Sequence, residues 1–192
     1  MKTILIMPVK SHSSRLKNKN LLPIKGLPMF VYTLFKAMKS KKINSFYVST
    51  ESKKIIQICN DFKIKFIKRP KYLAGKKIEK QEVIVNALNQ LKKKKITPKI
   101  VISLQANSPE VKTTQIDNAL YFFEKKLHPG APIKELITIN SKNIQDAAFR
   151  IMTLKAAFQK TLSTKLGVFR TNLVDIHDKK DYLQVKKRIE KH

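Results

Sequence analysis

The stretch from Ile4 to Asn20 constrains the fold of this chain more than any other part of the sequence. It opens with the apolar run Ile4 to Met7, which has no helical spacing, and it breaks at Pro8. A loop rich in hydroxyl and cationic groups follows, with Lys10, Ser11, Ser13, Ser14, Arg15, Lys17 and Lys19. This pattern predicts a buried strand of an α/β sheet that leads into a polar loop.

Two interpretations of this loop are open from composition. In open α/β sheets, ligands bind outside the carboxyl ends of the strands, and hydroxyl and ammonium groups there suit a polyphosphate. The alternative is a solvated basic loop, because lysine is abundant throughout the chain.

Length and composition favour one folded domain over residues 1–192. The chain has a mass of 22.2 kDa, and 42% of its residues are hydrophobic, which argues against general disorder. No apolar run is long enough for a membrane span, and the first ten residues lack the features of a signal peptide. We therefore expect a cytoplasmic protein with no membrane partner.

The net charge of +28 raises the hypothesis of a nucleic-acid partner. The excess is almost all lysine and is spread along the chain, whereas base-reading sites favour arginine. A compositional drift towards lysine explains it more simply, so no specific nucleic-acid partner is expected. The single cysteine, Cys59, lies in an apolar helical pattern and is predicted to be a buried thiol.

Apolar spacing predicts alternating strands and helices, and therefore a mostly parallel sheet with helices on its faces. Strands are expected at 4–7, 45–49, 64–67 and 100–104. Helices are expected at 29–40, 51–62, 78–91, 113–126 and from about 178 to 190, with Pro28 in the first turn of the first and Thr50 as the cap of the second. The region 127–162 is the hardest to interpret: Glu135 to Ile139 suits a strand, and Ala147 to Leu154 suits either a strand or a helix.

The first loop resembles the signature I-P-A-R-x-x-S-K-x-x-x-x-K-N of the sugar-acid cytidylyltransferases, which make CMP-sialic acid, CMP-Kdo and related donors. Pro8, Ser13, Lys19 and Asn20 match it, whereas Lys10 replaces the arginine and Ser14 replaces the first lysine. The likeness continues through the segment from Leu22 to Met29, which is similar to L-x-x-x-x-G-x-P-L.

Two further segments are similar to the same family. Lys68 to Ala74 resembles R-P-x-x-L-A, which implies that Arg69 reaches the nucleotide base; the alternative is a surface arginine before a proline turn. The next residues, Gly75 to Ile78, depart from the D-T-A-S-type stretch of the family. Gln105 to Pro109 resembles Q-P-T-S-P, which implies that Gln105 and Asn107 face the substrate, while Ser108 suits either a ligand or a turn cap.

The segment from Val174 to Leu183 resembles D-I-D-T-x-x-D-L, in which two aspartates hold Mg²⁺. Asp175 and His177 occupy those positions, although magnesium prefers oxygen ligands to imidazole. Asp178 and Asp181 instead suit the cap and third position of the last helix.

The resemblance implies a Rossmann-like three-layer sandwich of the nucleotide-diphospho-sugar transferase type. It also implies a nucleotidyltransferase that moves CMP from CTP to a sialic-acid-like sugar acid with Mg²⁺, for surface-glycan biosynthesis. Lys10 and Lys19 would be catalytic, Gln105 and Asn107 would bind the sugar acid, and the nucleotide would contact Pro8, Val9, Lys10, Ser13, Lys19, Asn20 and Arg69. The dimerisation and acceptor region of the family corresponds to 127–162 and is shortened here, which leaves a homodimer and the acceptor specificity open.

Four departures fall at functional positions of the family: Lys10, Ser14, the pair Lys76 and Lys77, and His177. They leave a second hypothesis open, in which the chain is a catalytically inactive family member that acts as a binding or regulatory protein.

Overall fold

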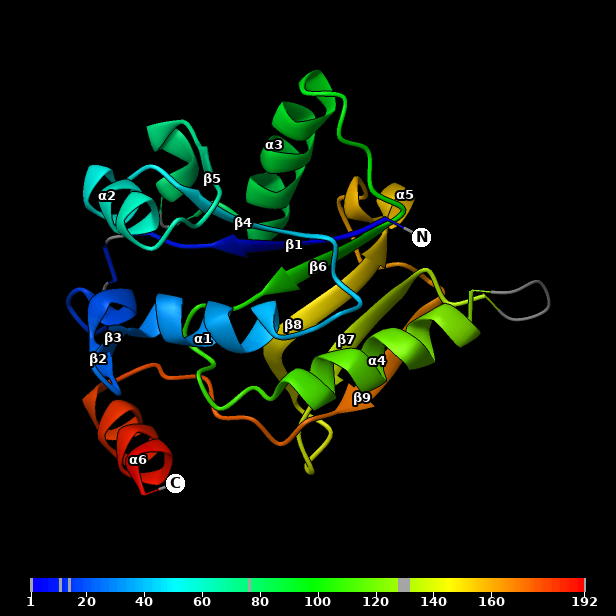
Figure 1. Ribbon diagram of the computed structural model, residues 1–192. Coiled ribbons are helices and arrows are strands. Elements are labelled where there is room, and N and C mark those ends of the chain that lie inside the picture. Colours follow the sequence, from blue (N-terminus) through cyan, green and yellow to red (C-terminus); the bar gives the residue numbers. More distant parts are fainter. Residues whose placement is uncertain (1, 11, 14, 76, 128–131, 192) are drawn as a thin grey trace.

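The computed structural model describes residues 2–10, 12–13, 15–75, 77–127 and 132–191 (Figure 1). Within them lies a seven-stranded sheet of order β5-β4-β1-β6-β8-β7-β9, in which β8 runs antiparallel to the other six strands. The strands are β1 (Thr3–Pro8), β4 (Ser45–Thr50), β5 (Phe66–Lys68), β6 (Ile100–Leu104), β7 (Glu135–Ile139), β8 (Gln145–Thr153) and β9 (Leu166–Arg170). A separate hairpin is formed by β2 (Pro23–Ile24) and β3 (Leu27–Pro28).

Helices cover both faces of the sheet, which gives the three-layer α/β architecture expected from the sequence (Figure 1). One face is covered by α1 (Met29–Met38), α2 (Lys53–Asp61) and α4 (Thr113–Lys125). The other is covered by α3 (Lys80–Lys93) and the short α5 (Leu154–Ala157). The last helix, α6 (Lys179–Glu190), packs on the β2-β3 hairpin, and two 3-10 turns lie at Lys19–Leu21 and Lys71–Ala74.

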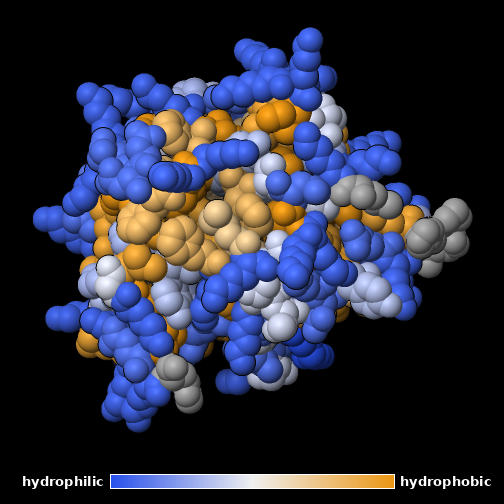
Figure 2. Space-filling model, in the orientation of Figure 1, coloured by the Kyte–Doolittle hydropathy of each residue, from blue (hydrophilic) through white to orange (hydrophobic). Residues whose placement is uncertain are grey.

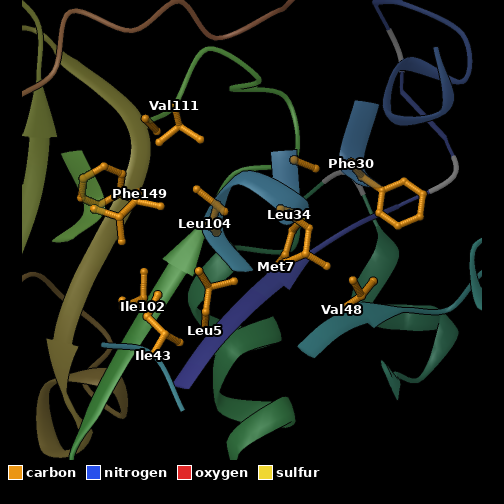
Figure 3. Close-up of a cluster of buried hydrophobic side chains, with 14 of the residues drawn as sticks. Leu5, Met7, Phe30, Leu34, Ile43, Val48, Ile102, Leu104, Val111 and Phe149 are labelled. Carbon is orange, nitrogen blue, oxygen red and sulfur yellow. The ribbon is translucent and has the colours of Figure 1, made fainter. Parts of the chain in front are cut away.

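Strand β1 is apolar on both sides because it lies between two hydrophobic layers. Leu5 and Met7 point into the layer under α1, where Figure 3 shows Met7 beside Leu34 and Leu5 near Ile43 and Ile102. Ile4 and Ile6 point into the opposite layer under α3. Each fully buried side chain of this size stabilises the fold by about 1.5–3 kcal/mol, so the uninterrupted apolar run is a direct signature of a central strand.

Several boundaries differ from the predictions. The second helix is capped by Ser52, whose hydroxyl accepts from Ile55 N at 3.4 Å, whereas Thr50 remains in β4. Pro28 is the cap residue of α1, one position before its first turn. The third strand starts two residues later than predicted, at Phe66.

Other expectations are confirmed. Residues 145–153 form a strand, which resolves the ambiguous segment, and the carboxylates of Asp178 and Asp181 form a reciprocal capping box at the start of α6. Cys59 is buried, and burial raises the pKa of its thiol to about 11.

The surface is mostly hydrophilic on the face seen in Figure 2, with one smaller apolar area near its centre. Across the described residues, no helix combines the length and apolar character needed to cross a bilayer.

Candidate functional site

A cavity of about 430 Å³ lies at the carboxyl ends of the parallel strands, where the chain leaves β1 and β6. The loop after β1, the start of α3 and the segment before α6 enclose it. Ten of the predicted site residues line it together: Pro8, Lys10, Ser13, Lys19, Asn20, Arg69, Gln105, Asn107, Asp175 and His177.

Val9 is the exception among the predicted residues. Its side chain is wholly buried in the layer under α1, and its amide donates to Ser49 O at 2.9 Å, which continues the β1-β4 ladder. It therefore contributes to the site only through its carbonyl oxygen, which accepts from Arg69.

Arg69 is 4% exposed, so the interpretation as a surface arginine is wrong. Its Nη2 lies 2.6 Å from Glu51 Oε2, and Nε donates to the same oxygen at 2.9 Å. Nη2 also donates to Val9 O at 3.3 Å. The guanidinium is thus held rigidly at the edge of the cavity by β1 and by the residue that follows β4.

The loop after β1 is closed by two side chains. Asn20 is buried and its Nδ2 donates to Lys10 O at 3.0 Å. Lys19 Nζ reaches across the cavity and donates to Ile176 O at 2.8 Å. Burial lowers the pKa of Lys19, although the carboxylate of Asp175 opposes that shift. The loop is therefore tied both to itself and to the segment before α6.

The end of β6 clamps the same segment. Asn107 donates from Nδ2 to Ile176 O at 3.0 Å, and its own carbonyl accepts from Ile176 N at 2.9 Å. Ser108 is wholly buried and its hydroxyl donates to Asp175 Oδ1. Asn107 was predicted to face the substrate; it does line the cavity, but its amide nitrogen is already engaged. Ser108 was predicted as a ligand or turn cap, and its hydroxyl in fact holds Asp175.

Asp175 is the one carboxylate among the described residues that line the cavity. Burial raises its pKa, and this effect outweighs the hydrogen bond from Ser108 and the charge of Lys80, both of which lower it. A carboxylate that lies in a cavity although burial disfavours its charged form is typical of functional sites.

Comparisons with known proteins agree with this geometry. The family model described as cytidylyltransferase matches residues 4–182. The chain belongs to the cytidylyltransferase family. It is 31% identical over 131 residues to the 8-amino-3,8-dideoxy-manno-octulosonate cytidylyltransferases of Shewanella sp. strain ANA-3 and Shewanella oneidensis. The match covers 68% of this chain and 50% of each relative, so the chain spans about half the length of these curated relatives.

Solved structures show the same fold. CMP:2-keto-3-deoxy-manno-octonic acid synthetase complexed with CTP superposes with a TM-score of 0.81 at 13% identity, over 100% of this chain and 99% of that one. A cytidylyltransferase from Leptospira borgpetersenii superposes with a TM-score of 0.74 at 18% identity, over 100% and 88% of the two chains.

Among the described residues that line the cavity, Asp175 is the one that could hold a metal ion through a carboxylate. No group of three or more His, Cys, Asp or Glu side chains suited to a metal occurs in the described part of the chain. Magnesium sites of nucleotide enzymes often use only one or two carboxylates, with substrate phosphates and water completing the shell, and Asp175 fits that mode. His177 lines the cavity but offers no oxygen ligand, and the Asp178 carboxylate is used as a helix cap.

Sequence reasoning missed one cavity residue of consequence. Lys80 is the first residue of α3 and lines the cavity with Lys10 and Asp175. Its only sequence signal was its place just after the stretch that departs from the family pattern. Of the four departures, Ser14 and Lys76 lie outside the described residues, and Lys77 is exposed and away from the cavity.

Proposed function

We propose that this chain transfers CMP from CTP to an eight-carbon sugar acid and releases pyrophosphate, as a step of surface-glycan biosynthesis. The observation that carries the proposal is the cavity at the strand ends, where a cationic loop faces the carboxylate of Asp175. The names of the relatives favour an eight-carbon acid over the nine-carbon sialic acids.

In the proposed reaction, the anomeric hydroxyl of the sugar acid attacks the α-phosphorus of CTP. A new P–O bond forms there as the bond to the oxygen that bridges to the β-phosphate breaks. Pyrophosphate leaves with that electron pair, and the proton of the attacking hydroxyl passes to solvent. Such transfers depend mainly on positioning and charge stabilisation. Lys10 and Lys19 would neutralise the triphosphate, while Ser13 and Asn20 would fix its oxygens.

The other predicted residues fit the two ends of this reaction. Arg69, locked by Glu51, would hold the nucleotide base without losing side-chain freedom on binding. Gln105 follows β6 beside Asn107 and would bind the sugar acid. Asp175 would hold Mg²⁺ together with the phosphates, and the bound ion would counter the charge that develops at the reacting phosphate.

A thermal-shift titration with CTP, UTP, ATP and GTP, with and without Mg²⁺, tests the donor half of the proposal, because a ligand that binds the native state raises its melting temperature. We expect a CTP-selective shift that grows with Mg²⁺, followed by pyrophosphate release with eight-carbon sugar acids. If CTP raised the melting temperature but no pyrophosphate was released in the presence of any sugar acid, the inactive binding protein would be favoured. No shift with any nucleotide would remove the enzyme hypothesis.

A further inference from the structure

A second cavity of about 430 Å³ adjoins the first on the α3 side of the sheet. It is lined by the start of α3, by Arg150 of β8 and by residues 160–162, and it shares Ile78 and Lys80 with the central cavity. Lys80 therefore stands where the two cavities meet. The described residues that line the second cavity belong partly to the region 127–162, where the acceptor site was expected.

The position of Lys80 is unfavourable for stability. It is a cation in the first turn of α3, the end of a helix that favours negative charge. Lys10 repels it, and desolvation of the ammonium lowers its pKa, although Lys80 as a whole is an exposed residue. Within the described residues, no carboxylate lies within 4 Å of its Nζ to form an ion pair, and only the charge of Asp175 opposes these effects. An ammonium that has no ion pair among the described residues and is repelled by a second lysine is typical of a ligand-binding position.

The second cavity has a rigid polar wall. Arg150 forms an ion pair with the wholly buried Glu135, and its Nη1 donates to Gln81 Oε1 at 2.8 Å. Gln81 in turn donates to Ala157 O, so β8, α3 and α5 hold this wall in place. Lys160 and Thr161 add further donors on the opposite segment. Lys80, Lys160 and Thr161 offer donors that suit the carboxylate and hydroxyl groups of a sugar acid, and Ile78 and Leu162 form an apolar part of the same lining.

We propose that Lys80 binds the carboxylate of the sugar-acid acceptor and that the second cavity holds its polyhydroxyl chain. This inference rests on the proposed function. In a 2-keto sugar acid the carboxylate is attached to the anomeric carbon. A carboxylate on Lys80, close to the charge of Asp175, therefore leaves the anomeric hydroxyl in the central cavity and directs the remaining carbons into the second one.

The first test replaces the ammonium without shortening the side chain, in Lys80→Met. The matched control is Lys77→Met, because Lys77 is also exposed but lines neither cavity. Loss of one charge-assisted contact should raise the KM for 3-deoxy-manno-octulosonate about 10-fold or more. The KM for CTP and the CTP thermal shift should stay within about twofold of wild type. Lys77→Met should match wild type in all three measurements. A second variant, Thr161→Trp, fills the second cavity and should raise the acceptor KM alone.

Binding of 3-deoxy-manno-octulosonate by isothermal titration calorimetry separates this inference from the proposed function, because it needs no turnover. Saturable binding to wild type that is lost in Lys80→Met and Thr161→Trp supports the site even if no pyrophosphate is released. Equal weakening of CTP and acceptor in Lys80→Met would identify Lys80 as a phosphate ligand and overturn the inference. Unchanged acceptor binding in both variants would overturn it as well.

Discussion

The two halves of the sheet are held together in different ways. The parallel half, β5-β4-β1-β6, packs through continuous apolar layers on both faces. The other half, β8-β7-β9, adds Leu136, Phe149 and Ile151 to the same core but also buries charge. Glu135 of β7 is wholly buried and paired with Arg150, and the carboxylate of Asp146 accepts from the hydroxyl of Thr171. The second half therefore depends on polar groups that must find partners, in addition to hydrophobic area.

The halves also supply opposite charges to the site. The loop after β1 brings cations, whereas the chain that follows β9 brings Asp175. The end of β6 joins them, because Asn107 and Ser108 hold the Asp175–Ile176 segment. The geometry of the candidate site therefore depends on how the second half is anchored to the first, and this dependence can be tested.

The largest expected effect is on stability, in Glu135→Ala. The variant leaves the Arg150 charge mostly buried without its carboxylate, which should lower the free energy of unfolding by about 3–5 kcal/mol. The control is Glu110→Ala, which breaks a surface pair whose Arg188 side chain is 47% exposed and should cost at most about 1 kcal/mol. Urea unfolding measures both. If both variants lowered the free energy of unfolding by a similar small amount, the second half would not depend on its buried charge.

Asp175→Asn tests the carboxylate that the second half supplies. We expect kcat to fall by about 10²–10³-fold, the effect of removing one group that stabilises the transition state. Asp178→Asn, three residues later, should keep kcat near wild type because that side chain caps α6. If Asp175→Asn retained wild-type kcat, the proposed role of this segment would be wrong.

Asp175→Asn should raise the stability of the protein although it lowers kcat. Burial raises the pKa of Asp175 above its ordinary value, so between those two values the native state binds more protons than the unfolded state. Stability from this group is therefore lost as pH rises through that window. At neutral pH, Asp175→Asn should be more stable than wild type, and the difference should disappear on acidification. Melting temperatures measured across this range provide the test.

Sequence patterns predicted the parallel half well because each strand carries its own signal. Ile100 to Leu104 is apolar at every position except Ser103, and the structure places β6 at those residues. By contrast, β8 mixes small, polar and charged residues such as Asp146 and Arg150, whose partners lie in β7 and beyond β9. No local pattern reveals a buried partner that is distant in the sequence, so this segment remained ambiguous.

The site shows the same limit. Local motifs identified the loop after β1, the end of β6 and Asp175, and the structure brings them together. Ser108 and Asp175 are 67 positions apart, and Lys80 reaches the cavity only because α3 packs on β1. A helical pattern shows that α3 buries one face, but it does not show what its first residue meets.

Ser108→Ala tests the junction between the halves. It removes the hydroxyl that donates to Asp175, so the pKa of Asp175 should rise further, since that hydrogen bond lowers it. We expect activity at neutral pH to fall about tenfold, with the acidic limb of the pH profile moved to higher pH. Ser49→Ala is the control, because the Ser49 hydroxyl is buried without a hydrogen-bond partner among the described residues. Equal losses in both variants would assign the effect to packing.

The smallest expected effect is in Asp178→Ala, at the helix that follows the Asp175 segment. The Asp178 side chain accepts from Asp181 N at 2.9 Å, and loss of such a cap costs about 1 kcal/mol. Lys179→Ala, at the exposed next position, should cost less. The informative measurement is the Mg²⁺ concentration that half-saturates activity. A cap that only anchors α6 leaves it unchanged, whereas a metal ligand raises it. If Asp178→Ala raised this Mg²⁺ concentration, Asp178 would be a second carboxylate of the C-terminal half that binds the metal. The two halves would then differ even more in the charge that they supply to the site.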